Sequence, residues 1–248
     1  MIISRQRRFV VFQPWKTASQ TLALRLRNFD DSPYSASFGF NEHLNRVVHH
    51  HLTCADFAAL PESRLGYFLA SFARNPYDRV YAGFRQLSVD MREQPALAFA
   101  EPWIRDLVLR QLDENQVQLK AANYDFDAWV ALLREAQIYE AGRNTSFPLH
   151  PAHYWTHLAG RQYVSFIGRV EQFEGDFTRL TELLGLGDLG RDNANVVELA
   201  SPTVAAGSRY AGRMHKRSID KITALFDADF ERFGYDRIGS ATAMSGHA

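Results

Sequence analysis

Three short apolar segments lie along the chain, at residues 8–12, 66–72 and 162–167. Their Val, Ile, Phe and Tyr content, without polar alternation, is typical of strands that are covered on both faces. A loop and a helical pattern follow each segment, with the helices expected at about residues 19–28, 76–89 and 171–184. Repeated strand–loop–helix units predict an α/β fold with a central parallel sheet flanked by helices.

Two further parts of the chain carry apolar residues at helical spacing. Between residues 88 and 142 these residues are Ile104, Leu107, Val108, Leu112, Phe126, Val130 and Leu133. They predict a mostly helical insertion, in which Asp125 or Asp127 caps the second helix. A last helix is predicted over residues 218–233. Its apolar face consists of Ile219, Ile222, Phe226 and Phe230.

The composition is that of an ordinary globular protein. The chain has 248 residues, of which 46% are hydrophobic and 23% are charged, and this excludes global disorder. The length fits one α/β domain, which we place at residues 1–238. The tail at residues 239–248 has almost nothing to bury and is predicted to be flexible.

Charge and cysteine content narrow the functional classes. The 28 basic and 28 acidic residues cancel, which argues against nucleic acid as a partner. Cys54 is the single cysteine, so no internal disulfide and no cysteine-based zinc site can form. No apolar run reaches the ~18–20 residues of a transmembrane helix. The apolar stretch before Gln13 is also too short for a signal-peptide core, and we expect a cytoplasmic protein.

The first candidate functional residues lie in the loop after the first predicted strand, QPWKTASQT at residues 13–21. At the carboxyl edge of a parallel sheet, a helix N-terminus with small residues presents backbone N–H groups to an anion. Lys16, one of four lysines in the chain, adds a positive charge there. The GxxxxGK[ST] motif of nucleoside-triphosphate loops is absent, because Lys16 precedes the small residues. The alternative interpretation is a solvated lysine before a capped helix.

Arg74 follows the second predicted strand, directly before a helix that begins with Pro76. Proline suits the first turn of a helix, where its missing N–H costs nothing. The planar guanidinium of Arg74 can bind a second phosphate through two hydrogen bonds. The alternative is an ion-paired helix start, in which Arg79 pairs with Asp78 or Asp90.

The two loops together resemble the cofactor motifs of the sulfotransferases that use 3′-phosphoadenosine 5′-phosphosulfate (PAPS), usually written PKTxGTSL and RxPxxRxxSxF. The matching segments are FQPWKTASQTL at residues 12–22 and FARNPYDRVYAGF at residues 72–84. Two later segments fit the same family in the same order, FIGRVEQFEGDFTRL at residues 166–180 and DADFERFGYD at residues 227–236. The resemblance is closest to the carbohydrate branch, the heparan and chondroitin O-sulfotransferases and their bacterial relatives.

This resemblance implies a P-loop-NTPase-like sulfotransferase fold that transfers the sulfuryl group of PAPS to a hydroxyl of a carbohydrate or another small alcohol. The product nucleotide is then 3′-phosphoadenosine 5′-phosphate (PAP), no metal takes part, and Lys16 also acts in catalysis. The residues implied to bind the donor are Lys16, Thr17, Ala18, Ser19, Gln20, Thr21, Arg74 and Arg209. Two positions depart from the family pattern, because Ser19 replaces a glycine and Ala82 stands where a serine usually binds the 3′-phosphate.

A run of histidines, VVHHHLT at residues 47–53, resembles the HxHV segment that carries the base of the heparan 2-O-sulfotransferases. The match makes His51 the base that accepts the hydroxyl proton of the acceptor, and His49 a substrate-binding neighbour. A neutral imidazole near pH 7 suits this role and contributes about 10²–10⁴-fold to the rate. The alternative is a surface turn, with Thr53 as the cap of the following helix.

A second histidine group, His150, His153 and His157, lies in PLHPAHYWTH. At helical spacing the three rings share a face, as metal ligands do, which leaves a metal-dependent hydrolase as an alternative. No acidic or cysteine partner lies nearby in the sequence, so a substrate loop is favoured. In that loop we expect His150, His153 and Trp155 to bind the acceptor.

Two other functions remain as alternatives. A small-molecule kinase on a related nucleotide-binding sheet would need the Walker lysine spacing and a magnesium-binding carboxylate after a strand, and the sequence offers neither clearly. A degenerate, non-catalytic module that binds a sugar or a partner is the alternative that Ala82 suggests.

Overall fold

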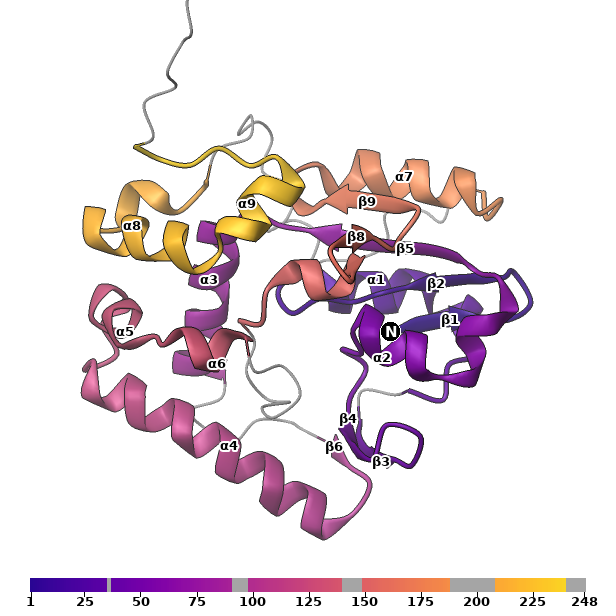
Figure 1. Ribbon diagram of the computed structural model, residues 1–248, viewed down its shortest axis with the longest axis horizontal. Helices are drawn as coiled ribbons and strands as arrows, with labels where there is room; N and C mark the ends of the chain where they lie inside the picture. Colours follow the sequence, from indigo (N-terminus) through magenta and orange to yellow (C-terminus); the bar gives the residue numbers. More distant parts are fainter. Residues whose placement is uncertain (35–36, 91–97, 140–148, 188–207, 240–248) are drawn as a thin grey trace, which may run out of the picture.

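The computed structural model describes residues 1–34, 37–90, 98–139, 149–187 and 208–239, and Figure 1 shows their arrangement. The central sheet has the strand order β1–β2–β5–β9. These strands are Ile2–Ser4, Phe9–Val11, Phe68–Ala73 and Phe166–Arg169. Strands β2, β5 and β9 run parallel, which confirms the predicted sheet. Strand β1 pairs with β2 in the antiparallel direction and was not predicted, because no helical pattern follows it directly in the sequence.

Helices cover both faces of this sheet, and one follows each parallel strand as predicted. They are α1 (Ser19–Leu26), α2 (Cys54–Ala59), α3 (Pro76–Arg85) and α7 (Phe173–Leu183). Phe9 and Val11 pack on the side of α1 and α7, whereas Val10 and Phe12 pack on the side of α2 and Trp155. The two sets alternate because successive side chains of a strand point to opposite faces.

The predicted helical insertion is confirmed. Its helices are α4 (Pro102–Ala121), α5 (Phe126–Leu132) and α6 (Glu135–Tyr139). Asp125 caps α5, because its carboxylate accepts a hydrogen bond from the Ala128 N–H at 2.8 Å. The insertion also contributes β6 to a small sheet of three strands, β4–β3–β6, which the sequence pattern did not predict. These strands are β3 (Ser37–Asn41), β4 (Arg46–Val48) and β6 (Ala98–Phe99).

The prediction of one last helix is wrong, because the segment forms two helices. They are α8 (Lys216–Leu225) and α9 (Asp227–Phe233), drawn in yellow in Figure 1. The break lies at Phe226, whose φ of −118° and ψ of 24° leave the helical region. The predicted apolar face is nevertheless confirmed, since all four of its residues are buried in the core that also contains α3.

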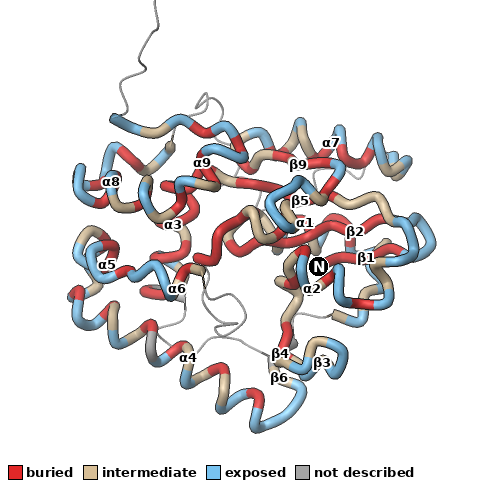
Figure 2. The backbone as a smooth tube through the Cα atoms, in the orientation of Figure 1, coloured by how far each residue is buried: buried red, intermediate tan, exposed pale blue. Residues whose placement is uncertain are grey.

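Short elements complete the described chain. They are β7 (His157–Leu158), β8 (Arg161–Gln162), the 3₁₀ turns η1 (Arg27–Phe29), η2 (Pro61–Leu65), η4 (Ala152–Trp155), η5 (Val170–Gln172) and η7 (Ala211–Arg213), and the π-helical turn η3 (Gln86–Asp90). The third predicted strand begins later than expected, because residues 161–162 pair with β7 in a hairpin. The predicted flexible tail falls, from residue 240 on, outside the described residues. Figure 2 shows burial concentrated on the central strands and α3.

Gly168 in β9 is a point where the sheet has no space for a side chain. A Cβ atom there would overlap the ring of Phe72 on the neighbouring strand β5, and that ring is fully buried. We expect Gly168→Ala to lower the free energy of unfolding by about 1–3 kcal/mol, because a packed ring has to move. Urea unfolding measures this change.

Gly175→Ala is the matched control on the exposed side of α7. A Cβ atom at Gly175 meets nothing within 4 Å, and alanine favours a helix by about 1 kcal/mol over glycine. The control variant is therefore expected to be as stable as the wild type or more stable. A Gly168→Ala variant that matches it would contradict the close contact with Phe72.

Candidate functional site

The loop between β2 and α1 presents a helix N-terminus without a side-chain cap. Ala18, the N-cap residue of α1, has a φ of 63° and makes no capping hydrogen bond. Lys16 also has a φ of 63°. A left-handed backbone costs a non-glycine residue about 1–3 kcal/mol and is typical of ligand-binding loops. The first N–H groups of α1 are therefore arranged as in an anion-binding turn.

Side chains inside the loop hold this conformation. The hydroxyl of the buried Thr17 donates to the Pro14 carbonyl at 3.0 Å. The Nε2 group of Gln13 donates to the Ser19 carbonyl at 2.8 Å. Lys16, Ala18 and Ser19 are half-buried, Gln20 is exposed and Thr21 is buried. The predicted donor-binding residues from 16 to 21 thus form one short turn, and part of it faces solvent.

Arg74 reaches the same turn from the next strand. Because β2 and β5 are parallel, the loops that follow them meet at one edge of the sheet. The Nη1 atom of the half-buried Arg74 lies 3.4 Å from the Lys16 carbonyl oxygen. Asn75 accepts a hydrogen bond from the Tyr77 N–H at 3.0 Å, and its own N–H donates to Glu171 at 2.7 Å. The guanidinium of Arg74 therefore lies beside the backbone of the loop that contains Lys16.

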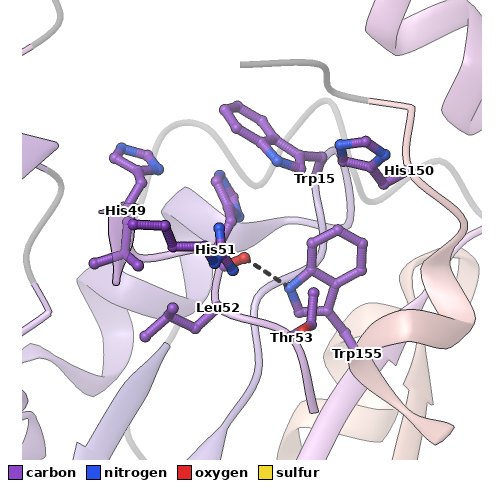
Figure 3. Close-up of a pocket in the computed structure, with 9 residues that line it drawn as sticks. Trp15, His49, His51, Leu52, Thr53, His150 and Trp155 are labelled. Carbon is purple, nitrogen blue, oxygen red and sulfur yellow. Dashed lines mark hydrogen bonds between the residues drawn. The ribbon is translucent and has the colours of Figure 1, made fainter. Parts of the chain in front are cut away.

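His51 also contacts this loop. Its Nδ1 atom hydrogen-bonds to the Gln13 carbonyl oxygen, and its ring stacks on Trp15 with the centroids 3.8 Å apart. A carbonyl oxygen can only accept, so Nδ1 carries the proton and Nε2 keeps the lone pair. The Trp155 indole N–H donates to the His51 carbonyl at 3.1 Å, drawn as a dashed line in Figure 3. The imidazole is thus held in the tautomer that a general base requires.

A small pocket lies beside His51. Figure 3 shows the histidine segment on one side of it and Trp155 on the other, with Trp15 and His150 along one edge. Its lining consists of Trp15, Arg46, Val48, His49, His51, Leu52, Thr53, His150 and Trp155. The cavity volume of about 30 Å³ holds about one water molecule. An acceptor as large as a sugar ring therefore has to widen the pocket.

Burial and crowding keep the imidazoles of His50 and His51 neutral. Desolvation, together with charge on His50 and His49, holds the pKa of His51 well below its usual value. Desolvation and charge on His49 lower the pKa of His50 to about 2. Both rings are therefore neutral at pH 7 in the folded protein, as a proton acceptor has to be.

Three of the predicted acceptor residues line this pocket. The ring of His49 lies between Phe38 and Trp15, with centroid distances of 4.2 and 5.8 Å. His150 is buried, and its Nδ1 lies 2.8 Å from the Ile138 carbonyl, which fixes the same tautomer as in His51. Trp155 is the third of these residues. The predicted cap Thr53 is confirmed as the N-cap of α2.

His153, the fourth predicted acceptor residue, does not line the pocket and binds Asp229 instead. Its Nδ1 lies 2.7 Å from the Asp229 carboxylate, which also accepts from the Ala152 N–H and from Arg79. Burial alone would raise the pKa of Asp229, but the hydrogen bond from His153 and the charge of Arg79 hold it below its usual value. The alternative in which Arg79 pairs with Asp78 is wrong, because the carboxylate that binds its guanidinium is Asp229.

Asp78 anchors the segment that contains Arg209. Its carboxylate accepts from the N–H groups of Arg209 at 2.9 Å and Tyr210 at 3.0 Å, and from the Ser208 hydroxyl. Tyr210 stacks on Tyr81 of α3 with the centroids 4.6 Å apart. The exposed Arg209 is therefore attached to the helix that begins next to Arg74.

The three histidines considered as metal ligands are not assembled into a site. The Nδ1 atoms of His150, His153 and His157 lie next to three different groups, the Ile138 carbonyl, Asp229 and the Thr156 hydroxyl. Within the described part of the chain, the group that could hold a metal ion is His49, His50 and His51. His50 is not among the residues predicted from the sequence, although the run of three histidines carried the signal.

Comparison with known proteins adds one finding. A family model described as "Sulfotransferase family" matches residues 1–236. No curated protein and no solved structure matches the chain. Among the described helices, none combines the length and the apolar character needed to cross a membrane.

The lowered histidine pKa values make stability depend on pH. Below about pH 6.5 the unfolded chain binds protons on His50 and His51 that the folded protein does not bind. The free energy of unfolding therefore falls as the pH falls, by about 1 kcal/mol for each of the two histidines at pH 5.5. We expect the Tm to fall between pH 7.5 and 5.5, and to fall less in His50→Gln.

His215→Gln is the control for this measurement, because the His215 side chain is 82% exposed. Its Tm is expected to follow the wild-type dependence on pH. A His50→Gln profile that runs parallel to the wild-type profile would show that His50 is not buried in its neutral form.

Proposed function

Because the chain belongs to the sulfotransferase family and is therefore a sulfotransferase, we propose that it transfers the sulfuryl group of PAPS to a hydroxyl of a carbohydrate or another alcohol. One observation carries this proposal, the convergence of three groups on a single loop. Arg74 contacts the Lys16 carbonyl, and His51 binds the Gln13 carbonyl at the start of the same loop. A base, a cation and a helix N-terminus thus surround one small region.

The charges at this sheet edge fit the two anionic ends of PAPS. The uncapped N-terminus of α1, with Lys16, suits the 5′-phosphosulfate. Arg74 suits the 3′-phosphate, and we assign to Arg209, whose backbone N–H is bound to Asp78 of α3, the role of closing over the donor. Ala82 offers no hydroxyl, so charge rather than a serine hydrogen bond has to hold the 3′-phosphate. Lys16 and Arg74 supply the positive charge that magnesium supplies in kinases, and the proposal therefore needs no metal.

The reaction is an in-line displacement at sulfur. The acceptor oxygen forms a bond to sulfur while the bond from sulfur to the phosphate oxygen of PAP breaks on the opposite side. His51 takes the hydroxyl proton on Nε2, and Lys16 with the N–H groups of α1 stabilises the negative charge that develops on the leaving phosphate. The sulfated acceptor and PAP leave, and His51 returns its proton to water. By analogy with phosphoryl transfer, positioning and electrostatics supply most of the rate.

The aromatic side chains beside His51 support an acceptor with a ring. Trp155 is almost fully buried, lines the pocket, and its indole N–H is bound to the His51 carbonyl, so it is a fixed aromatic wall that an acceptor reaches when the pocket widens. Trp15 presents a second aromatic ring at the edge of the same pocket. Pockets with aromatic walls and few polar groups orient small ligands in this way. We infer that a sugar hydroxyl enters beside these two rings.

Binding of PAP tests the donor site without any acceptor. We expect Arg74→Ala to weaken the binding of PAP about 10–100-fold in calorimetry, because a charge-assisted hydrogen bond contributes about 1.5–3 kcal/mol.

Lys16→Ala is expected to lower turnover by several orders of magnitude and to keep the fold, as judged by circular dichroism. ATP with magnesium is expected to give no thermal shift comparable to that of PAP.

The exposed Arg179 and Lys216 provide matched controls, with side chains 70% and 81% exposed. Alanine at either position should leave the affinity for PAP and the turnover unchanged. Wild-type turnover in Lys16→Ala would contradict the donor assignment. Tight binding of PAP with no transfer to any alcohol would favour the non-catalytic module.

His51→Asn tests the base with little change in packing. The asparagine Nδ2 can keep the hydrogen bond to the Gln13 carbonyl, while the lone pair of Nε2 is lost. We expect kcat to fall about 10²–10⁴-fold and the affinity for PAP to stay within a few-fold. Because the pKa of His51 is lowered, the acid limb of the wild-type rate profile should lie below pH 6.5.

His150→Asn is the comparison variant, since His150 lines the same pocket and has the same tautomer. It is expected to raise KM for the acceptor more than it lowers kcat. The reverse outcome, in which kcat collapses in His150→Asn and survives in His51→Asn, would transfer the role of base to His150.

A further inference from the structure

The histidine cluster, His49, His50 and His51, brings three imidazoles together directly after β4. Neighbouring ring centroids are 3.9 and 4.0 Å apart, and those of His49 and His51 are 5.2 Å apart. One ring nitrogen of each residue lies within 4.8 Å of those of the other two. Successive side chains of an extended segment point to opposite sides, so this convergence is a specific local arrangement.

Aromatic packing holds the cluster in place. Phe38 stacks on His49, and Trp15 stacks on His51, with centroids 4.2 and 3.8 Å apart. The ring of His50 contacts the rings of both His49 and His51. Its Nδ1 is buried and has no hydrogen-bond partner among the described residues. A buried ring nitrogen without a partner is rare in folded proteins, and a bound ion is one physical reason for it.

Three imidazole nitrogens bind only a narrow range of metal ions. Nitrogen ligands suit Zn²⁺, Cu²⁺ and Ni²⁺, whereas Mg²⁺ and Ca²⁺ prefer oxygen. Tetrahedral zinc with bonds of about 2.0–2.1 Å needs its nitrogens roughly 3.3 Å apart, so small ring rotations have to close the cluster. Arg46 is the cation that lines the adjacent pocket, and it is paired with Asp56 at 2.5 Å. Its charge is therefore largely compensated.

We propose that the histidine cluster binds a divalent transition metal ion of the zinc type, and that this ion inhibits sulfuryl transfer. Each ring donates a nitrogen lone pair to the metal, which releases water from its hydration shell. Inhibition follows because the lone pair of His51 is then no longer available to the acceptor proton. This second part of the inference rests on the proposed function, whereas the binding itself does not.

An open fourth position for water is typical of sites with three histidine ligands. The pocket that His49 and His51 line, with a volume of about 30 Å³, offers space for that water.

Metal binding is tested on the full-length protein without a histidine tag. Zn²⁺ affinity is measured by calorimetry, and Co²⁺ is added separately as a spectroscopic probe whose visible bands report the ligand geometry. We expect wild-type protein to bind one Zn²⁺ with micromolar affinity or better, and His50→Gln to bind it at least 10-fold more weakly. His215→Gln, with its exposed side chain, is expected to bind as the wild type does.

Activity provides the second measurement. Zn²⁺ should inhibit the wild type, and a chelator should restore its turnover. His50→Gln should keep basal turnover. Its inhibition should require at least 10-fold more Zn²⁺ than that of the wild type. Equal Zn²⁺ affinity in wild type and His50→Gln would overturn the metal site, even if PAP binds normally. Zn²⁺ binding that leaves wild-type turnover unchanged would overturn the inhibitory role. Failure to bind PAP would instead refute the proposed donor site and leave the metal measurement intact.

Discussion

The candidate site depends on the parallel pairing of β2 with β5. Parallel neighbours end at the same edge of a sheet, so the loops that follow them meet, although 58 positions separate Lys16 from Arg74. The same edge receives His51, whose ring is bound to the carbonyl of Gln13. Antiparallel pairing of these two strands would carry Arg74 to the opposite edge of the sheet. The loop that contains Lys16 would then have no second cation beside it.

Two carboxylates, the half-buried Glu171 and the buried Asp229, hold the later parts of the chain around this edge. Glu171 accepts from the N–H of Asn75 and from the Tyr235 hydroxyl, both at 2.7 Å. Asp229 joins Arg79 to His153 in the same manner. Both acids belong to segments that resemble family motifs. Their contacts join parts of the fold and take no part in the proposed reaction. Breaking the buried ion pair of Asp229 with Arg79 would leave an uncompensated charge, so this contact holds α9 against α3.

The sequence was sufficient to predict the parallel strands, most of the helices and the residues of the loop that contains Lys16. Apolar segments of five to seven residues, each followed by a helical pattern, predicted the three parallel strands, and family-like motifs singled out Lys16, Arg74 and His51. Strands β1 and β3 were missed because no strand–loop–helix unit marks them in the sequence. The partner of Arg79 lies 150 positions away, and no local pattern encodes such a distance. The convergence of His50 with its neighbours likewise depends on packing against Trp15.

The left-handed backbone at Lys16 and Ala18 also limits how the loop can change during evolution. A β-branched side chain at either position would add steric conflict to a conformation that already disfavours lysine and alanine. Glycine removes this conflict, and asparagine or aspartate tolerates it, but at position 16 each of them would delete the ammonium group. Position 18 can therefore drift among small residues, whereas position 16 has to keep a strained lysine if the loop binds the donor as proposed.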